Sequence, residues 1–187
     1  MKRVFIAIDL PENIKTGLAG LGSSLPRART VPPDQLHLTL KFIGEVEGGT
    51  LLDIEECLEK VSATIFSIRL KGVGVFPPRS TPRILWAGVH SGKQLTVLRN
   101  RIETALENIG IPRENRKYSP HITLARLKNT PIQRLSRFLT ENSFLESPDF
   151  TVNGFALYSS RLTPKGAIHT LLRQYRFPIT NKTQPAN

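Results

Sequence analysis

Two short segments in which apolar and polar residues alternate constrain the fold more than any other feature of the sequence. The first is LHLTLKFIG, residues 36–44. Its pattern predicts a β-strand, because successive side chains of a strand point to opposite faces of the sheet. The face expected in the core is formed by Leu36, Leu38, Leu40 and Phe42. The opposite, polar face is formed by His37, Thr39 and Lys41.

The second segment is SPHITLARL, residues 119–127, in which His121 aligns with His37 and Thr123 with Thr39. With 4 His and 16 Thr in the chain, two of the four histidines precede a threonine by two residues by chance in about 4% of cases. The copies lie 121 − 37 = 84 residues apart, so we expect them on equivalent strands of two similar halves. If these halves pack about a pseudo-two-fold axis, both histidines face one cleft.

A pair of facing histidines suits acid–base catalysis, because imidazole titrates near neutrality and one ring can accept a proton while the other donates one. Metal-free hydrolysis of a phosphodiester needs both roles. A threonine two residues on lies about 6.6 Å further along the same face of the strand, where its hydroxyl can donate to a phosphate oxygen. Metal binding is the alternative, but no further ligand-type residue stands at a suitable spacing beside either motif, and threonine binds zinc poorly.

The chain is strongly basic, with 26 Lys and Arg against 15 Asp and Glu and a net charge of +11. This excess favours a polyanionic partner, RNA or DNA, since neutralised phosphates release their counterions. The alternative is a solvated basic surface, because the charge is spread along the chain. Only RENRK (113–117) and the region from Arg173 to Arg176 are locally rich in cations.

The other two histidines and the single cysteine are expected to take no part in the reaction. His90 lies at the end of an expected strand and is assigned to the surface. His169, in the alternating segment AIHTLLRQY, is assigned a structural role or a place in the cleft wall. A lone cysteine, Cys57, excludes a disulfide framework and a cysteine-rich zinc site. It is expected as a small core residue of a helix.

Strand-like and helix-like segments interleave along the chain without an evident linker. Expected turns from Gly72 to Arg83 and from Arg161 to Gly166 favour antiparallel pairing. The predicted fold class is α+β, with two pseudo-symmetric lobes of mostly antiparallel sheet, helices outside and a central cleft. Residues 1–187 are expected to form a single bilobal domain with a polar tail over about 180–187.

The sequence contains no apolar run long enough to span a membrane. Asp9 interrupts the apolar stretch near the N-terminus, and no small-residue cleavage site follows it. We therefore expect no signal peptide, no membrane partner and a cytoplasmic location.

The sequence resembles the two-histidine (2H) phosphoesterases, and among them the RNA 2′,3′-cyclic phosphodiesterases, which are also described as 2′-5′ RNA ligase-like. The resemblance covers nearly the whole chain and rests on KRVFIAIDLP, LHLTLKFIG, GVGVFP, RILWAGV, SPHITLARL and FALYSSRLTPKG. It implies a bilobal α+β fold, no metal or other cofactor, and opening of a 2′,3′-cyclic phosphate to a 2′-phosphate.

Carried onto this chain, the resemblance implies that His37 donates a proton to the departing 3′ oxygen and that His121 accepts one from water. Thr39 and Thr123 then hold the non-bridging oxygens. The choice of donor and acceptor comes from the resemblance alone, because pseudo-symmetric motifs give no physical ground for it. The resemblance also implies that close relatives have a tyrosine at the position where this chain has His169.

Two basic residues that follow the motifs, Lys41 and Arg126, are predicted to bind substrate. Lys41 shares the predicted face of His37. Simple alternation puts Arg126 on the face opposite His121. A bulge or the end of the strand would turn Arg126 toward the cleft; otherwise it binds elsewhere.

The predicted partner is RNA that ends in a 2′,3′-cyclic phosphate, for example a tRNA fragment, and the chain is expected to act as a monomer. Stacking of a terminal base is open to Phe5, Phe42 or Tyr158, although core packing is the commoner fate of each. Reversal of the reaction, as 2′-5′ ligation to a 5′-hydroxyl end, is allowed in principle. Two alternatives stay open: a cyclic phosphodiesterase that acts on a small nucleotide metabolite, and a non-catalytic RNA-binding module.

Overall fold

A computed structural model describes residues 1–78, 81–164 and 166–178 of the chain. The strands are β1 (Lys2–Asp9), β2 (Ala28–Thr30), β3 (His37–Val46), β4 (Phe66–Phe76), β5 (Ile84–Ser91), β6 (His121–Leu127), β7 (Phe150–Val152), β8 (Gly154–Thr163) and β9 (Gly166–Arg176). The helices are α1 (Glu12–Leu18), α2 (Gly48–Glu59), α3 (Lys93–Glu107), α4 (Ile132–Glu141) and the short 3₁₀ helix η1 (Pro33–Gln35). The expected polar tail lies outside the described residues.

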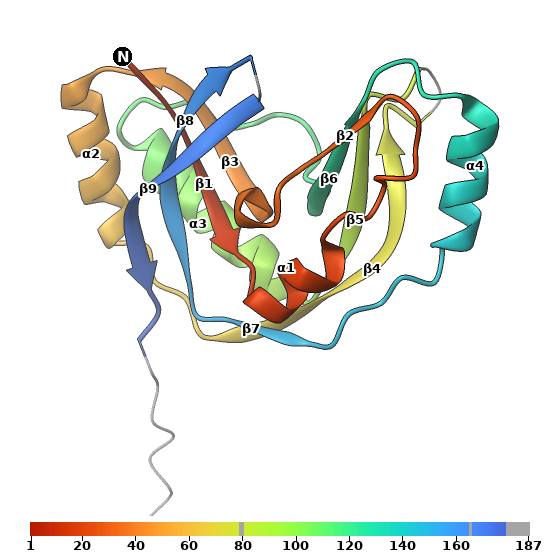
Figure 1. Cartoon of the computed structure of the whole chain (residues 1–187). Coiled ribbons are helices and arrows are strands. Elements are labelled where there is room, and N and C mark those ends of the chain that lie inside the picture. The colour runs from red at the N-terminus through yellow and green to blue at the C-terminus, as the bar shows by residue number, and fades with distance from the viewer. Residues whose placement is uncertain (79–80, 165, 179–187) are drawn as a thin grey trace, which may run out of the picture.

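The strands form one antiparallel sheet in the order β7-β4-β5-β6-β3-β1-β8-β9, and β2 pairs with β6. This sheet folds into two lobes that curve toward each other (Figure 1). In the first lobe, strands β3, β1, β8 and β9 are covered on the outside by α2 and α3; α4 lies outside the second lobe (Figure 1). The predicted α+β class with two lobes and outer helices is confirmed.

The sequence pattern predicted that each lobe is built from one half of the chain. The structure differs, because each lobe contains segments from both halves. The apolar and β-branched residues of FTVNGFALYSSRL, residues 150–162, favour one continuous strand, but the strand breaks at Asn153. The part before the break, β7, pairs with β4 in the second lobe, whereas β8 pairs with β1 in the first. The C-terminal hairpin of β8 and β9, in contrast, forms as predicted, with Thr163 opposite Gly166.

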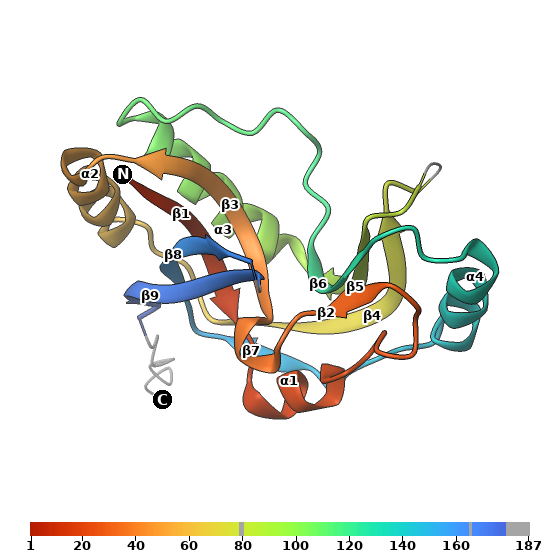
Figure 2. The same cartoon turned by 45° about the horizontal axis from the view of Figure 1, so that its top comes forward.

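The lobes meet in the sheet where β3 pairs with β6, through Leu38 and Ile122. Both side chains are fully buried. Among the described residues, Leu38 and Ile122 are the one pair that joins these two strands, and β6 pairs further along with β2 (Figure 2). The pair therefore joins the two halves of the sheet.

A β-bulge in β3 corrects the predicted face of two residues. Ile6 of β1 lies opposite Lys41 and Ala7 lies opposite Thr39, so Leu40 is an extra residue in β3. A bulge of this kind inverts the alternation beyond it. Lys41 is consequently 6% exposed and Phe42 is 69% exposed. The prediction that Lys41 shares the polar face of His37, with Phe42 in the core, is wrong.

Candidate active site

A cavity of about 400 Å³ lies between the lobes and is lined by residues of both. His37 and Thr39 reach it from β3, and Thr123 and Arg126 reach it from β6. Among the described residues that line it there is no carboxylate, and the two cations are Arg3 and Arg126. A hollow with this lining suits an anionic ligand.

The two His-Thr pairs are arranged symmetrically about the pair Leu38–Ile122. Because β3 and β6 are antiparallel and these two residues lie opposite each other, His37 is the strand neighbour of Leu38 on the side of Thr123. On the other side of the pair, Thr39 flanks Leu38 where His121 flanks Ile122. Each histidine is thus placed across from the threonine of the other motif. His37, Thr39 and Thr123 line the cavity, and His121 packs beside it against Phe76 of β4.

Both imidazoles are oriented in the same way by the backbone. His37 Nδ1 lies 2.8 Å from the Gln35 carbonyl oxygen, and His121 Nδ1 lies 2.7 Å from the Ser119 carbonyl oxygen. A carbonyl oxygen can only accept, so each ring donates its Nδ1–H. The Nε2 atom of each neutral ring then carries the lone pair that can exchange a proton in the cleft.

An aromatic ring packs behind each of these histidines. The Phe5 ring centroid lies 4.8 Å from that of His37 in the first lobe, and the Phe76 centroid lies 5.0 Å from that of His121 in the second. Phe76 is in turn 5.3 Å from Trp86. Trp86 fits there because Gly74 has no side chain: a Cβ at Gly74 would overlap the indole ring. Packing thus limits how each imidazole can turn.

The pKa of His37 is lowered to about 4, chiefly by burial, and the charges of His169 and His121 contribute to the lowering. The hydrogen bond to Gln35 and the carboxylate of Asp9 oppose this shift. In the ligand-free chain His37 is therefore neutral at pH 7. A bound phosphodiester anion would favour its protonation, because an opposite charge nearby stabilises the charged imidazole.

Arg126 reaches the cavity through a bulge in β6. Leu85 of β5 lies opposite Ala125 and Trp86 lies opposite Thr123, so Leu124 is an extra residue. Of the alternatives for Arg126, a bulge that turns it to the cleft is the one found. This bulge has the same place in its motif as the one in β3, since Phe42 and Arg126 each stand five residues after their histidine.

Lys41 is not brought to the cavity. Its Nζ atom lies 2.8 Å from Glu103 Oε2 and donates to the Pro112 carbonyl oxygen at 2.7 Å. Arg99 binds the other oxygen of the same carboxylate at 2.9 Å. The substrate-binding role predicted for Lys41 is therefore replaced by a buried ion pair on the outer face of the strand.

Most residues that line the cavity were not among the site residues predicted from the sequence, and Phe42 and His169 are two of them. Phe42 was placed in the core because a bulge leaves no mark in a pattern of alternation. His169 was given a structural or cleft-wall role, and its place in the wall is confirmed. Its ring centroid lies 5.1 Å from that of His37, and its backbone N–H donates to the Gln35 Oε1 atom at 2.9 Å. Burial and the charge of Arg126 both lower the pKa of His169.

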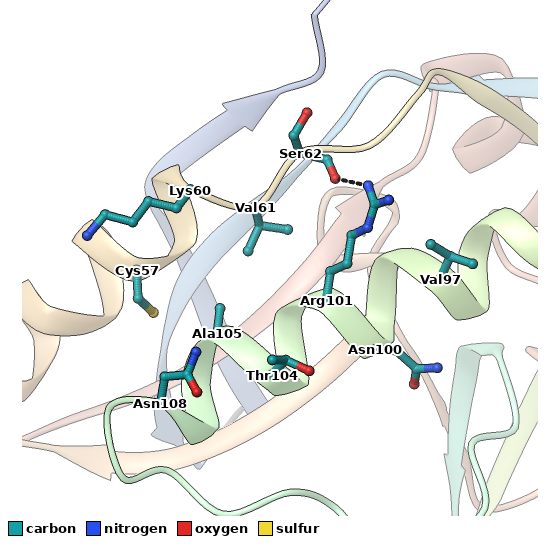
Figure 3. Close-up of a pocket in the computed structure, with 10 residues that line it drawn as sticks. All are labelled: Cys57, Lys60, Val61, Ser62, Val97, Asn100, Arg101, Thr104, Ala105 and Asn108. Atoms are coloured by element: carbon teal, nitrogen blue, oxygen red, sulfur yellow. Dashed lines mark hydrogen bonds between the residues drawn. The ribbon is translucent and has the colours of Figure 1, made fainter.

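A second hollow, of about 630 Å³, lies on the outer surface between α2 and α3 (Figure 3). Arg101 donates there to the Ser62 carbonyl oxygen (Figure 3). The wall includes Cys57, which is buried as expected and donates to the Ile54 carbonyl oxygen at 3.3 Å. Burial raises the pKa of this thiol, as for an unreactive cysteine. None of the predicted site residues lines this hollow.

Across the described ranges, no group of three or more His, Cys, Asp or Glu side chains is placed to hold a metal ion. None of the helices in these ranges is both long and apolar enough to cross a membrane.

The sequence is similar to the sequences of known proteins. The model of the 2′-5′ RNA ligase superfamily matches residues 13–163. Two proteins named RNA 2′,3′-cyclic phosphodiesterase are similar along most of their length. The one from Archaeoglobus fulgidus is 35% identical over 178 residues, 92% of this chain and 99% of that protein. The one from Thermus thermophilus is 38% identical over 184 residues, 92% of this chain and 89% of that protein.

Solved structures show the same fold. A crystal structure of a Thermus thermophilus protein superposes with a TM-score of 0.79 at 29% identity, covering 94% of this chain and 97% of that one. Escherichia coli LigT in complex with 3′-AMP superposes with a TM-score of 0.76 at 25% identity, covering 94% and 98%.

Proposed function

This chain belongs to the 2′-5′ RNA ligase superfamily, and on that premise we propose that it opens RNA 2′,3′-cyclic phosphate ends to 2′-phosphomonoesters by metal-independent acid–base catalysis. The relatives named RNA 2′,3′-cyclic phosphodiesterase support this reaction. The observation that carries it is the pair of imidazoles, each with Nδ1 bound to a backbone carbonyl and each beside a threonine across one strand pair.

In the proposed reaction, His121 Nε2 accepts a proton from water while the water oxygen attacks phosphorus. The bond between phosphorus and the 3′ oxygen breaks, and His37 Nε2 donates a proton to that oxygen. The products are a 2′-phosphomonoester and a free 3′-hydroxyl. The donor and acceptor assignment follows the family resemblance. It requires that His37, neutral in the free chain, takes up a proton as the anionic substrate binds.

The other cavity residues would hold the substrate. The Thr39 and Thr123 hydroxyls donate to the non-bridging oxygens, and Arg126 and Arg3 supply positive charge to an otherwise uncharged wall. Phe42 offers an exposed ring beside the His-Thr pairs, on which the terminal base can stack. The same groups, acting in reverse, would join a 2′-phosphate product to a 5′-hydroxyl end.

The proposed substrates include the cyclic ends of tRNA fragments, and the proposed working unit is the monomer. In support of a monomer, residues of a single chain, among them His37, Thr39 and Thr123, line the cavity.

The test is to incubate the purified protein, with EDTA present, with a short RNA that ends in a 2′,3′-cyclic phosphate. We expect an alkali-resistant 2′-phosphate of the mass of the hydrolysed ring. His37→Ala and His121→Ala should each lose most of this activity, whereas His90→Ala, on the surface, should keep it. Full activity in either cleft variant would contradict the mechanism.

If the wild-type protein does not hydrolyse the RNA, further measurements distinguish the two alternative functions. RNA binding without turnover would point to a non-catalytic module. Turnover of a nucleoside 2′,3′-cyclic phosphate with no action on RNA would point to a small metabolite as substrate.

A further inference from the structure

A third hollow, of about 550 Å³, adjoins the cavity and shares Arg126 with it. Its lining comes from β2, the end of β6 and the residues beside them, and contains four cations: Arg27, Arg29, Arg126 and Lys128. We call this hollow the basic groove. Over the described parts of the chain, none of the four forms a salt bridge with a carboxylate.

The position of these cations is fixed by backbone pairing. Arg29 and Arg126 lie directly opposite each other where β2 pairs with β6. The Lys128 N–H donates to the Arg27 carbonyl oxygen at 3.1 Å, which ties the segment before β2 to the one after β6. Like charges directly opposite each other in a sheet are unfavourable. An anion between them removes that repulsion, so the groove is suited to a ligand with several negative charges.

The groove also reaches the other lobe. Arg29 extends to the tip of the β8–β9 hairpin, where a Cβ built on Gly166 would lie 3.1 Å from its guanidinium group. Gly166 has a φ of +125° and itself lines the cavity. The groove therefore adjoins the candidate active site at Arg126 and, through Arg29, at Gly166.

From this arrangement we infer that the basic groove binds the backbone phosphates of the nucleotides that precede the cyclic end of the RNA. The inference rests on the proposed function and goes further: it makes the substrate an oligonucleotide rather than a free nucleotide. Arg126 stands at the junction, so the terminal phosphate lies on its cavity side and the preceding phosphates lie toward Arg27 and Lys128. The phosphates of an RNA strand repeat at even spacing, so they match the row of cations in the basic groove better than the carboxylates of an acidic peptide do.

The test compares two substrates: a nucleoside 2′,3′-cyclic phosphate and an RNA hexanucleotide with the same cyclic end. The variant is Arg27→Gln with Lys128→Gln, and the matched control is Lys93→Gln with Arg134→Gln, two exposed cations outside the groove. We expect kcat/KM for the hexanucleotide to fall about tenfold in the groove variant and to stay unchanged in the control. The value for the nucleoside should stay unchanged in both.

Salt dependence gives a second readout. The slope of log kcat/KM for the hexanucleotide against log salt concentration should become shallower by about 0.7 for each phosphate that the variant no longer neutralises. Thermal unfolding of all three proteins identifies any variant that is misfolded, and in that case Lys128→Gln alone is measured.

Equal losses on both substrates, or no loss on the hexanucleotide, would overturn the inference while leaving the proposed function intact. If the wild type turns over neither substrate, the proposed function fails. Binding of the hexanucleotide, measured by fluorescence anisotropy, then tests whether the basic groove binds phosphates. Weaker binding by the groove variant than by the wild type supports the inference, and equal binding overturns it. Displacement of the RNA by polyglutamate at equal charge would also overturn it.

Discussion

The Tyr118 hydroxyl donates a hydrogen bond to the Thr39 carbonyl oxygen at 3.0 Å, so a residue just before the second motif holds the backbone of the first. Burial raises the pKa of Tyr118, which keeps the hydroxyl protonated and able to donate. The Arg99 guanidinium lies 4.7 Å from the centre of the Tyr118 ring and binds Glu103, the partner of Lys41. This set of contacts encloses the bulge that separates Thr39 from Lys41.

Removal of that hydroxyl should disturb the reaction more than the fold. For Tyr118→Phe we expect the free energy of unfolding to fall by about 1 kcal/mol and kcat to fall severalfold, because Thr39 is no longer held. Tyr175→Phe is the matched control, since Tyr175 also donates to a carbonyl oxygen, that of Glu55, at 3.3 Å and outside the cavity. Urea unfolding and steady-state kinetics measure both effects. Equal kinetic losses in the two variants would refute a positioning role for Tyr118.

Lys41 and Arg126 should give opposite results when each is replaced by Met. Lys41→Met removes one partner of a buried ion pair and should cost about 3–5 kcal/mol of stability, with KM unchanged for the protein that remains folded at low temperature. Arg126→Met changes an exposed residue of the cavity and should leave the unfolding curve nearly unchanged while kcat/KM falls. The buried role of Lys41 is excluded if Lys41→Met is fully stable but weak in substrate binding.

Acid should destabilise the protein through His37. Its pKa is about 4 in the folded chain and near 6.5 when unfolded, so between these values the unfolded state binds more protons and stability rises with pH. The contribution is complete above about pH 6.5 and is lost as the pH falls toward 4, a total of about 3 kcal/mol. Denaturant unfolding of the wild type and His37→Gln from pH 7 to pH 4.5 measures it. A difference between the two proteins that does not vary with pH would disprove the shift.

Phe42→Ala should weaken substrate use without weakening the fold. The ring is 69% exposed, so little burial is lost, whereas stacking of one base contributes about 1–3 kcal/mol. We expect kcat/KM to fall by roughly five- to 150-fold. Phe144→Ala is the control, because that ring is 95% exposed and outside the cavity. A large loss of stability with kcat/KM preserved would return Phe42 to the core role predicted from the sequence.

Thr39→Val and Thr123→Val should each reduce kcat/KM less than the histidine variants do. Each removes one hydrogen bond to a charged phosphate, which is worth about 1.5–3 kcal/mol. Thr64→Val, at an exposed position away from the cavity, should behave as wild type. A threonine variant with unchanged kcat/KM would show that its hydroxyl does not contact the phosphate in the transition state.

Much of the site could be predicted because the alternation around His37 and His121 is a local property of each strand. That pattern correctly placed both His-Thr pairs on one face and found the duplication. It failed at the residues after the threonines, where a bulge moves Phe42 into the cleft and Lys41 out of it. A bulge depends on the register with a neighbouring strand, and no single segment encodes that register.

The two-lobed α+β architecture was predicted from the sequence, but the strands that form each lobe were not. The reason is similar. The pairing of β2 with β6 joins residues about a hundred positions apart, and the break at Asn153 sends adjacent strands to different lobes. Both depend on contacts between distant segments, which hydrophobic periodicity does not report. The basic groove, made by β2 and the end of β6, could not be found before that pairing was known.

Each cleft histidine takes its orientation from the carbonyl group two residues before it. The carbonyl acceptor and the imidazole ring therefore belong to the same stretch of three residues, Gln-Leu-His in one copy and Ser-Pro-His in the other. Duplication of a short piece of gene would copy an imidazole already in its working tautomer, with no second mutation needed elsewhere to orient it.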